Sequence, residues 1–317
     1  MELQDIGLLV EKIKNNVAKV IVGKEEIIDL SMICVITGGH MLLEDVPGTG
    51  KTVFARALAS SVDCSFRRIQ FTPDLLPSDV TGINFFNQKE NNFVFRPGPV
   101  FSNIVLADEI NRATPRTQSA MLECMEERQV TIDGETKRLS APFLVIATQN
   151  PIEIQGTFPL PEAQLDRFLI KTSMGYPDTQ SGINILKRFK ESNPLTELKA
   201  AATGEEILEA SRIYSKVRVS DDILEYIIKI AEGTRKHPGV HLGVSPRGTQ
   251  ALLKAIQVYA LIKGRTFVTP DDVKAMAQPV LAHRIIPKGL SAENVSISEK
   301  VISDVLSHTE VPLEQAE

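Results

Sequence analysis

The stretch HMLLEDVPGTGKT, residues 40–52, decides the fold of this chain. A short apolar run ends in a glycine-rich turn, and Gly50-Lys51-Thr52 then opens a helical pattern, which is the strand–loop–helix order of a phosphate-binding loop. Glycines let backbone N–H groups approach phosphate oxygens, and the helix behind them adds unpaired N–H groups and the positive end of its dipole. We expect the Lys51 ammonium to reach the β- and γ-phosphates of a nucleotide and the Thr52 hydroxyl to hold Mg²⁺. The chain departs from the strict pattern at Asp45, where the pattern has glycine.

Composition and length predict a soluble, globular protein with room for two domains. The chain has 317 residues, of which 43% are hydrophobic and 24% charged, and its formal net charge is −5. Neither the charge nor the length of the apolar runs favours a nucleic-acid-binding or membrane-inserted protein, and the N-terminal segment has no signal-peptide core. Three cysteines and five histidines are scattered without metal-ligand spacing, so the cysteines are expected to be buried thiols in a reducing cytoplasm.

Strand and helix patterns alternate from residue 1 to about residue 177. The expected strands are short runs of apolar or β-branched residues, as in parallel strands that are covered on both faces. They are Met41–Glu44, Phe66–Phe71, Ile104–Ala107, Phe143–Thr148 and Phe168–Thr172. The helical patterns follow Lys51, with Val53, Phe54, Ala57, Leu58 and Val62 on one face, and cover Arg116–Glu127, with Met121, Leu122 and Met125 facing inward. The alternation predicts a doubly wound α/β sheet with helices on both faces.

Two segments interrupt this alternation and are expected to be β-hairpins. The first, residues 84–101, has a polar tip at Asn87–Asn92 between two apolar runs. The second, Gln129–Leu139, has the turn Asp133-Gly134 between alternating strands, which is typical of a two-residue hairpin loop. Both hairpins are insertions relative to a minimal sheet.

After Tyr176-Pro177 the strand patterns stop, and helix-start signals take their place. Thr203 begins a capping box, Ser220 precedes two aspartates, and Ser245 and Thr269 each stand before a proline at the first helical position. These signals predict an α/β domain at residues 1–177 and a separate all-helical domain at residues 178–317.

Polar side chains follow two of the expected strands. Asp108 and Glu109 come at the end of one apolar strand, and Asn150 follows the next strand along the chain. In an ATPase with a phosphate-binding loop, the first acid of such a pair ligates Mg²⁺ and the second polarises the attacking water. We expect the Asn150 amide to orient that water. The alternatives are a solvated strand end for the acids and an ordinary turn amide for Asn150.

Three arginines are candidates for contact with a γ-phosphate, because a planar guanidinium spreads positive charge over its oxygens. Arg112 follows the acid pair, and Arg167 stands at the entrance of the last strand, where it suits a finger into a neighbouring subunit. Arg247 lies in the first turn of a helix in the second domain and is expected to report nucleotide state to that domain. The alternative for Arg167 is a surface ion pair with Asp166 or Glu162. The alternative for Arg247 is a capping or interdomain salt bridge.

These motifs, in this order, resemble those of the AAA+ superfamily and, within it, the MoxR family. The resemblance covers roughly residues 5–285 and is most specific at residues 40–177. Residues 42–52 (LLEDVPGTGKT) are similar to the Walker A motif of the family, in which the missing first glycine is usual, and residues 107–113 (ADEINRA) to its Walker B motif. Three further segments are similar to the helix and hairpin before sensor 1, the sensor 1 strand and the arginine-finger segment. They are residues 121–131 (MLECMEERQVT), 147–151 (ATQNP) and 160–168 (LPEAQLDRF).

The resemblance implies an AAA+ core with a helix-2 insert at about residues 72–101, a pre-sensor-1 hairpin and an all-α lid. It implies hydrolysis of ATP with Mg²⁺ held by Thr52 and Asp108, and with Glu109, Asn150, Arg167 and Arg247 as catalytic groups. The positions implied to bind the nucleotide are Val22, Gly23, Pro47, Gly48, Thr49, Gly50, Lys51, Thr52 and Val53, of which the first two line the adenine pocket. Family membership leaves open whether Arg247 acts in cis or in trans.

Members of this family are chaperone-like and work with von Willebrand A domain proteins on the maturation of enzyme complexes or the insertion of metal cofactors. The resemblance therefore implies a cytoplasmic ring, expected to be a hexamer, that remodels a protein client together with such a partner. The alternatives are a DNA-acting motor and a non-catalytic scaffold gated by ATP. We see no dedicated nucleic-acid domain in the sequence, and the intact Lys51, Asp108, Glu109 and Asn150 argue against the scaffold.

Overall fold

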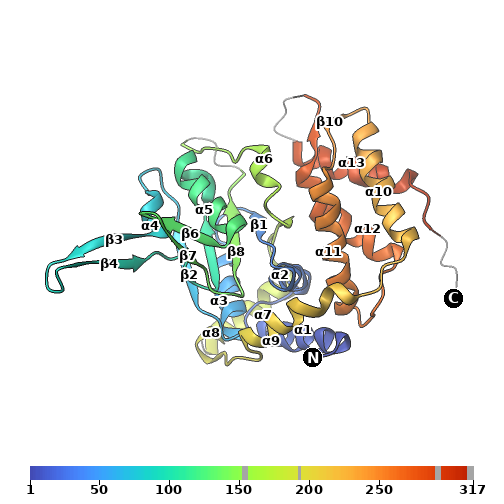
Figure 1. Ribbon diagram of the computed structural model, residues 1–317. Coiled ribbons are helices and arrows are strands. Elements are labelled where there is room, and N and C mark those ends of the chain that lie inside the picture. The colour runs from blue at the N-terminus through green and yellow to red at the C-terminus, as the bar shows by residue number, and fades with distance from the viewer. Residues whose placement is uncertain (152–155, 192–193, 290–293, 313–317) are drawn as a thin grey trace.

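Five parallel strands form the central sheet of the computed structural model, which describes all residues except 152–155, 192–193, 290–293 and 313–317 (Figure 1). In their order across the sheet they are β2 (Phe66–Gln70), β5 (Ile104–Asp108), β8 (Leu144–Gln149), β1 (Met41–Glu44) and β9 (Ile170–Thr172). All five segments predicted to be strands are confirmed, with ends that shift by at most two residues. The carboxyl ends of these strands share one edge of the sheet, because every pair is parallel.

Strand β2 lies at one edge of the sheet and differs from the expected apolar pattern. Its sequence is FRRIQ, and the side chains of Arg67, Arg68 and Gln70 are exposed. The prediction that every strand is covered on both faces was therefore wrong for this strand. An edge strand has one neighbour and partly open faces, so long polar side chains are tolerated there.

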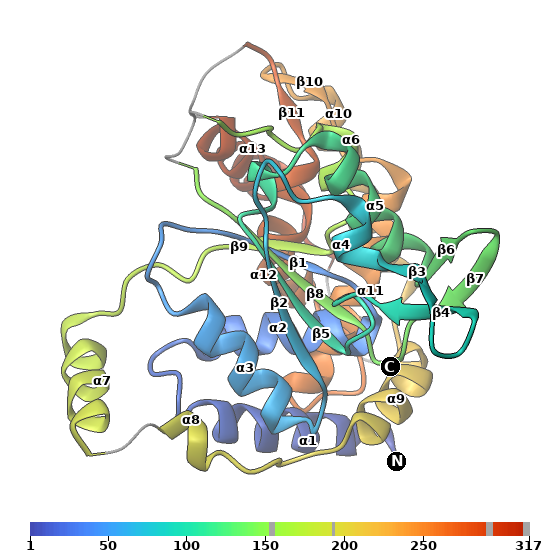
Figure 2. The same cartoon turned by 90° about the vertical axis from the view of Figure 1, so that its left-hand side faces the viewer.

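Helices cover both faces of the sheet, as predicted. On one face, Leu43 and Leu106 pack with α1 (Leu3–Val17), α2 (Glu25–Thr37) and α3 (Lys51–Ser61). On the other face, Leu42 and Val105 pack with residues of α4 (Pro77–Thr81) and α5 (Pro115–Glu127). Figure 2 shows these two layers on either side of the strands.

The predicted inward faces of α3 and α5 are confirmed, with one exception. Phe54 and Leu58 of α3 are fully buried, as are Met121 and Leu122 of α5. Val53 was placed on the same face as Phe54 and Leu58, but 38% of its surface is exposed. It shares a face with exposed Arg56, three residues further along, and is turned by about 100° from buried Phe54.

Two antiparallel hairpins extend from the sheet, where the sequence predicted them. The first is made of β3 (Gly82–Asn87) and β4 (Asn92–Pro97), and Figure 1 shows it projecting away from the body of the protein. The second is made of β6 (Gln129–Ile132) and β7 (Glu135–Arg138). Its turn residues Asp133 and Gly134 both have positive φ, of 49° and 83°, as a type I′ turn requires.

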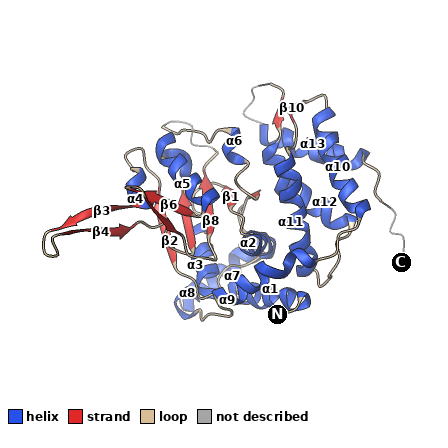
Figure 3. Cartoon of the chain, viewed as in Figure 1, coloured by secondary structure: helices blue, strands red, loops and turns tan. Residues whose placement is uncertain are grey.

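The chain after Pro177 is mainly helical (Figure 3). Its helices are α7 (Thr179–Glu191), α8 (Pro194–Glu197), α9 (Gly204–Ile213), α10 (Asp221–Lys236), α11 (Pro246–Ile262), α12 (Pro270–Leu281) and α13 (Asn294–His308), whereas the short helix α6 (Glu162–Leu165) lies before β9. The side chains of Thr203, Ser220 and Ser245 accept hydrogen bonds from the first turns of α9, α10 and α11, and Thr269 forms a capping box at α12, as predicted.

A short antiparallel sheet, β10 (Val240–Leu242) and β11 (Ile286–Pro287), lies among these helices. The prediction that strands stop after Pro177 was wrong at this point. Strands of three and two residues are too short to produce a recognisable pattern in a sequence.

One hydrophobic core joins the sheet to the C-terminal helices. Helix α11 packs against both α1 and α2, and α9 packs against α2. The division of the chain into separate domains at residue 177 stays a prediction. No described helix is both long and apolar enough to cross a membrane.

Candidate active site

The glycine-rich loop between β1 and α3 has the conformation that the sequence predicts. Gly48 and Gly50 have φ of +86° and +93°, which side chains other than glycine rarely tolerate. A Cβ atom at either position would meet nothing within 4 Å in the described structure, so the space over the loop is open. The Lys51 ammonium donates to the carbonyl oxygens of Asp45 and Val46, each at 3.1 Å, which folds the lysine over its own loop.

Asp45, at the position where the strict pattern has glycine, anchors the loop to the segment after β9. Its carboxylate accepts hydrogen bonds from the backbone N–H groups of Met174 at 2.5 Å and Gly175 at 3.0 Å, and from the Ser173 hydroxyl at 3.3 Å. Asp45 is buried, so these donors compensate for its desolvation. In the sequence, Asp45 stands out only as a departure from a pattern, because its partners are 128 or more positions away.

The predicted adenine-pocket segment lies against the same region of the chain. Gly23 has a φ of +67°, and a Cβ atom there would lie 2.5 Å from the Ser181 Oγ of α7. The neighbouring Lys24 ammonium donates to the carbonyl oxygens of Met174 and, at 3.2 Å, Tyr176. The Val22-Gly23 turn and the phosphate-binding loop are therefore linked through residues 173–176.

The two predicted acids lie at the carboxyl end of β5 and are held by a buried threonine. The Thr148 hydroxyl donates to Asp108 Oδ1 at 2.6 Å and accepts the backbone N–H of Glu109 at 2.8 Å. Glu109 has a φ of 56° and a ψ of 50°, a left-handed conformation that is unfavourable for a residue with a side chain. Such strain is typical of functional positions. No pattern in the sequence singles out Thr148 for this role.

Three polar side chains besides Thr148 contact the acid pair. Arg68 of β2 donates to Asp108 Oδ2 from Nε at 2.9 Å and from Nη2 at 2.7 Å. Glu109 Oε2 accepts from Gln70 Nε2 at 2.8 Å and from Arg112 Nη1 at 3.1 Å. Arg112 therefore contacts an acid of its own subunit, which does not favour the γ-phosphate contact considered for it in the sequence.

Asn150 follows β8, the strand that separates β5 from β1 in the sheet. The amide thus lies at the same edge as the acid pair and the phosphate-binding loop, as predicted from the order of the motifs. Ligands of open α/β sheets bind at such carboxyl ends.

Arg167 and Arg247 lie together on the side of the sheet where the strands begin, opposite the carboxyl ends that carry the phosphate-binding loop. Arg247 Nη2 is 2.5 Å from Glu126 Oε2, and Arg167 Nε is 4.0 Å from the same oxygen. Arg247 Nε is also 3.9 Å from Asp166 Oδ2. Within the described part of the chain, Arg167 pairs with Glu126 rather than with Asp166 or Glu162, the partners considered in the sequence. Arg247 joins α11 to the sheet domain, as in the salt-bridge alternative.

The position of this arginine pair follows from the strand directions. Leu169 N–H donates to the carbonyl of His40, which precedes β1, so the segment with Arg167 enters β9 at the amino edge. The four residues of β1 span about 13 Å between that edge and the phosphate-binding loop. Neither guanidinium is therefore close to the loop of its own chain.

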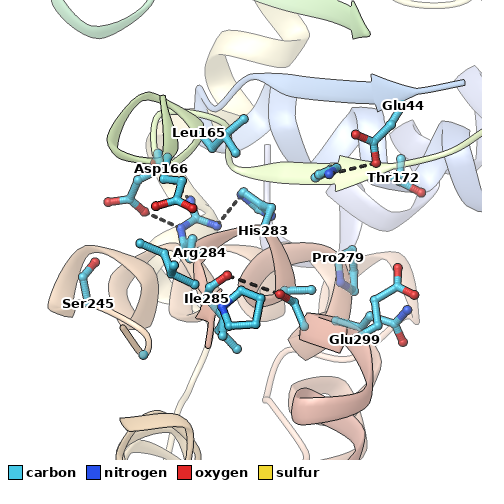
Figure 4. Close-up of a pocket in the computed structure, with 18 of the residues that line it drawn as sticks. Glu44, Leu165, Asp166, Thr172, Ser245, Pro279, His283, Arg284, Ile285 and Glu299 are labelled. Atoms are coloured by element: carbon cyan, nitrogen blue, oxygen red, sulfur yellow. Dashed lines mark hydrogen bonds and ion pairs between the residues drawn. The ribbon is translucent and has the colours of Figure 1, made fainter. Parts of the chain in front are cut away.

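Buried Arg284 holds the lid against the segment that carries Arg167 (Figure 4). Its Nε donates to Asp166 Oδ1 at 2.6 Å, and its Nη2 donates to the Phe168 carbonyl at 2.7 Å. The neighbouring His283 bonds to the same carbonyl through Nε2 at 3.0 Å. Burial, together with the Arg284 charge, lowers the pKa of His283 well below its ordinary value.

His40 joins three elements at the same edge. Its Nδ1 accepts the backbone N–H of Val145 at 3.0 Å, so Nε2 carries the proton and donates to the Met125 carbonyl at 3.0 Å. Burial lowers the pKa of His40 to about 4. The ring is therefore neutral at pH 7.

A cavity of about 860 Å³ lies between β9 and the lid helices (Figure 4). Its lining includes Glu44, Asp166, Thr172 and Arg284, but none of residues 47–53 of the phosphate-binding loop. It is therefore a space between sheet and lid, separate from the open surface over the loop.

Comparison with known proteins places this geometry in a family. The chain is 38% identical to the chaperone MoxR1 of Mycobacterium tuberculosis, over 93% of this chain and 80% of that protein. The chain belongs to the MoxR family of AAA+ ATPases. Residues 40–170 match the ATPase family associated with various cellular activities (AAA), and residues 232–305 match the AAA lid domain.

Two further relatives match this chain over nearly its whole length. YeaC of Bacillus subtilis is 48% identical over 99% of this chain and 98% of its own length. A crystal structure of a Cytophaga hutchinsonii protein assigned as an ATPase superposes with a TM-score of 0.89, at 37% identity, covering 98% of this chain and 97% of that one. The AAA+ core and helical lid implied by the resemblance are confirmed.

The residues present fit a nucleotide and its metal. The open space over two positive-φ glycines can take phosphate oxygens, and Lys51 and the first turn of α3 supply positive charge. A threonine hydroxyl and an aspartate are oxygen donors of the kind that Mg²⁺ prefers. Asp108 already attracts a cation, the Arg68 guanidinium.

Proposed function

We propose that this MoxR-family protein hydrolyses ATP in a Mg²⁺-dependent reaction and uses the energy for chaperone-like remodelling of protein complexes in the cytoplasm. The observation that carries the proposal is the alignment of three groups at one sheet edge: the phosphate-binding loop after β1, Asn150 after β8, and the acid pair after β5. This set is what phosphoryl transfer needs, because its catalysis depends on positioning and charge stabilisation.

Each residue has a role in this proposal. Lys51 and the backbone from Pro47 to Thr52 bind the phosphates, and the Val22-Gly23 turn and exposed Val53 contact the nucleoside. Thr52 and Asp108 would hold Mg²⁺, which neutralises charge on the phosphates. Glu109 accepts a proton from the attacking water, and Asn150 orients that water.

The catalytic site is completed by a second subunit. Arg167 and Arg247 lie at the amino edge of the sheet, about a strand length from their own loop, so both suit a γ-phosphate bound by a neighbour. This arrangement favours action in trans for Arg247, which the sequence had left open. A head-to-tail contact of this kind forms a ring when its rotation closes, and we propose a hexamer.

The partner and client are proteins. We propose a von Willebrand A domain partner, with maturation or cofactor insertion as the outcome for the client. The β3–β4 hairpin exposes Phe85, Phe86 and Phe93, with 67% of Phe93 accessible, which suits contact with apolar protein segments. A DNA-acting motor is less well supported, because the exposed basic residues of this hairpin, Lys89 and Arg96, are accompanied by Glu90 and by more numerous exposed apolar side chains.

Replacing Glu109 by glutamine tests the activity. The variant should bind ATP with unchanged affinity but release phosphate at least about 100-fold more slowly, because it lacks the proton acceptor. Glu123→Gln, at an exposed position of α5, is the matched control and should keep full turnover. Normal turnover by Glu109→Gln would remove this residue as the water-activating group, and no phosphate release by wild-type protein would favour the ATP-gated scaffold.

The trapped Glu109→Gln protein also tests the partner. With ATP bound, it should retain a von Willebrand A domain protein in a pull-down more strongly than the same protein with ADP. Equal retention in both states would contradict coupling of the partner to hydrolysis.

A further inference from the structure

Arg68 makes a strong contact with the carboxylate that is proposed to hold the metal. Two of its nitrogens donate to Asp108 Oδ2, at 2.9 Å and 2.7 Å. The Asp108 side chain is 12% exposed, whereas Arg68 is 44% exposed and can move toward solvent. A guanidinium therefore neutralises the acid from its outer, accessible side.

The second carboxylate oxygen is held by a different kind of group. Asp108 Oδ1 accepts the Thr148 hydroxyl at 2.6 Å, an uncharged donor from the neighbouring buried strand. Thr148 keeps the carboxylate oriented without changing its charge. Of these two partners, Arg68 alone carries a positive charge that would repel a divalent cation.

The geometry points to Arg68 as an internal competitor of the divalent cation. We propose that Arg68 neutralises Asp108 until metal and nucleotide bind, and that its guanidinium must leave Oδ2 when the metal arrives. The inference rests on the proposed Mg²⁺-dependent reaction. It predicts that Arg68 raises the metal concentration needed to load the site.

When Arg68 leaves Asp108, the hydrogen bonding around the neighbouring acid, Glu109, also changes. Arg68 Nη2 donates to Gln70 Oε1 at 2.5 Å, and Gln70 Nε2 donates to Glu109 Oε2 at 2.8 Å. Movement of Arg68 thus removes the donor that orients the Gln70 amide toward Glu109. Metal loading and the orientation of the water-activating acid are linked through one strand.

Titration of the full-length protein with Mn²⁺, followed by electron paramagnetic resonance in the presence of the non-hydrolysable analogue AMP-PNP, tests the proposal. In Arg68→Met, which keeps the bulk and loses the charge, half-saturation should occur at a Mn²⁺ concentration at least about 3-fold lower than in wild type. Arg68→Lys keeps the charge and should stay closer to wild type.

Arg67→Met is the matched control, since Arg67 is an exposed arginine on the same strand and successive side chains point to opposite faces. It should leave half-saturation unchanged.

Thermal unfolding of each variant shows whether the fold is kept, and a Mn²⁺ shift in a variant with wild-type unfolding supports the proposal. Unchanged or weaker Mn²⁺ binding by Arg68→Met would overturn it. An absence of nucleotide-dependent Mn²⁺ binding in wild type would instead overturn the proposed Mg²⁺ site.

Discussion

Arg247 of the lid and Glu126 of α5 form an ion pair, with Nη2 and Oε2 2.5 Å apart, and Arg167 approaches the same oxygen at 4.0 Å. One carboxylate therefore stands between two guanidinium groups that would otherwise repel each other. A γ-phosphate from a neighbouring subunit has enough negative charge to replace Glu126 for both arginines. Because Arg284 fastens the lid to Asp166, next to Arg167, the Arg167 and Arg247 guanidinium groups lie on one continuous surface.

Loss of either arginine should abolish turnover and leave nucleotide binding intact. Arg167→Ala and Arg247→Ala remove charge from the amino edge of the sheet, while the loop at the carboxyl edge is unchanged. We expect phosphate release to fall at least about 100-fold for Arg167→Ala, the effect of removing an arginine finger. Arg212→Ala, at a well-exposed surface position, is the control. Equal turnover of mutant and wild type at ring-forming concentrations would contradict the assigned role.

Replacing Asp45 by glycine, which the strict loop pattern has there, should lower both the stability of the fold and the affinity for nucleotide. Asp45→Gly removes the acceptor of the Met174 and Gly175 N–H groups and leaves both unpaired. We expect the free energy of unfolding to fall by about 1–3 kcal/mol and nucleotide affinity to fall with it. Asp45→Asn keeps one acceptor oxygen and should lose less. Chemical denaturation and nucleotide titration measure both effects, and a more stable glycine variant would refute this account of Asp45.

The Thr148 hydroxyl should matter for both stability and catalysis. Thr148→Val keeps the shape of the buried side chain but removes the hydrogen bonds to Asp108 Oδ1 and the Glu109 N–H. We expect about 1–3 kcal/mol less stability. The kcat should fall more than KM rises, because Glu109 loses support for its left-handed backbone. Thr148→Ser should restore both quantities, and a valine variant with normal kcat would exclude this positioning role.

Stability should depend on pH through His40. Its pKa is about 4 in the folded protein against an ordinary value of 6.5, so the unfolded chain binds more protons between these limits. The contribution of the neutral His40 ring to the free energy of unfolding is therefore complete above about pH 6.5 and is lost as the pH falls toward 4. Between pH 8 and pH 5 we expect a loss of about 2 kcal/mol from this group.

His283 acts in the same direction, because its pKa is also lowered. The comparison of wild type with His40→Gln isolates His40. The variant should be less stable at pH 8 but should lose less stability on acidification. Denaturation curves that show the same pH dependence in both proteins would contradict the assignment.

Local chemistry made most of the site predictable from the sequence. Gly48, Gly50 and Lys51 act through the backbone of one loop, and Asp108, Glu109 and Asn150 follow strands whose apolar patterns are clear. The strands β1 and β5 and the Asp133-Gly134 turn were predicted for the same reason. Each depends on neighbours within a few positions.

The rest depends on contacts between distant segments. The partners of Asp45 and the pair between Arg68 and Asp108 join positions 40 or more residues apart, and no local pattern indicates them. Arg247 was placed on a lid helix by its Ser245-Pro246 start, but its position beside Arg167 depends on how α11 and Arg284 pack. Val53 was placed on the apolar face of its helix because an exposed apolar residue has the same sequence signature as a buried one.

Mixing two inactive variants tests the shared site most directly. Lys51→Ala loses phosphate binding but keeps its arginines, whereas Arg167→Ala keeps the loop and loses the finger. Each should be inactive alone, and an equal mixture should recover about a quarter of wild-type turnover, since that share of random interfaces joins an intact loop to an intact finger. A mixture with no more turnover than the separate proteins, in assemblies shown by native mass spectrometry to contain both, would contradict the account.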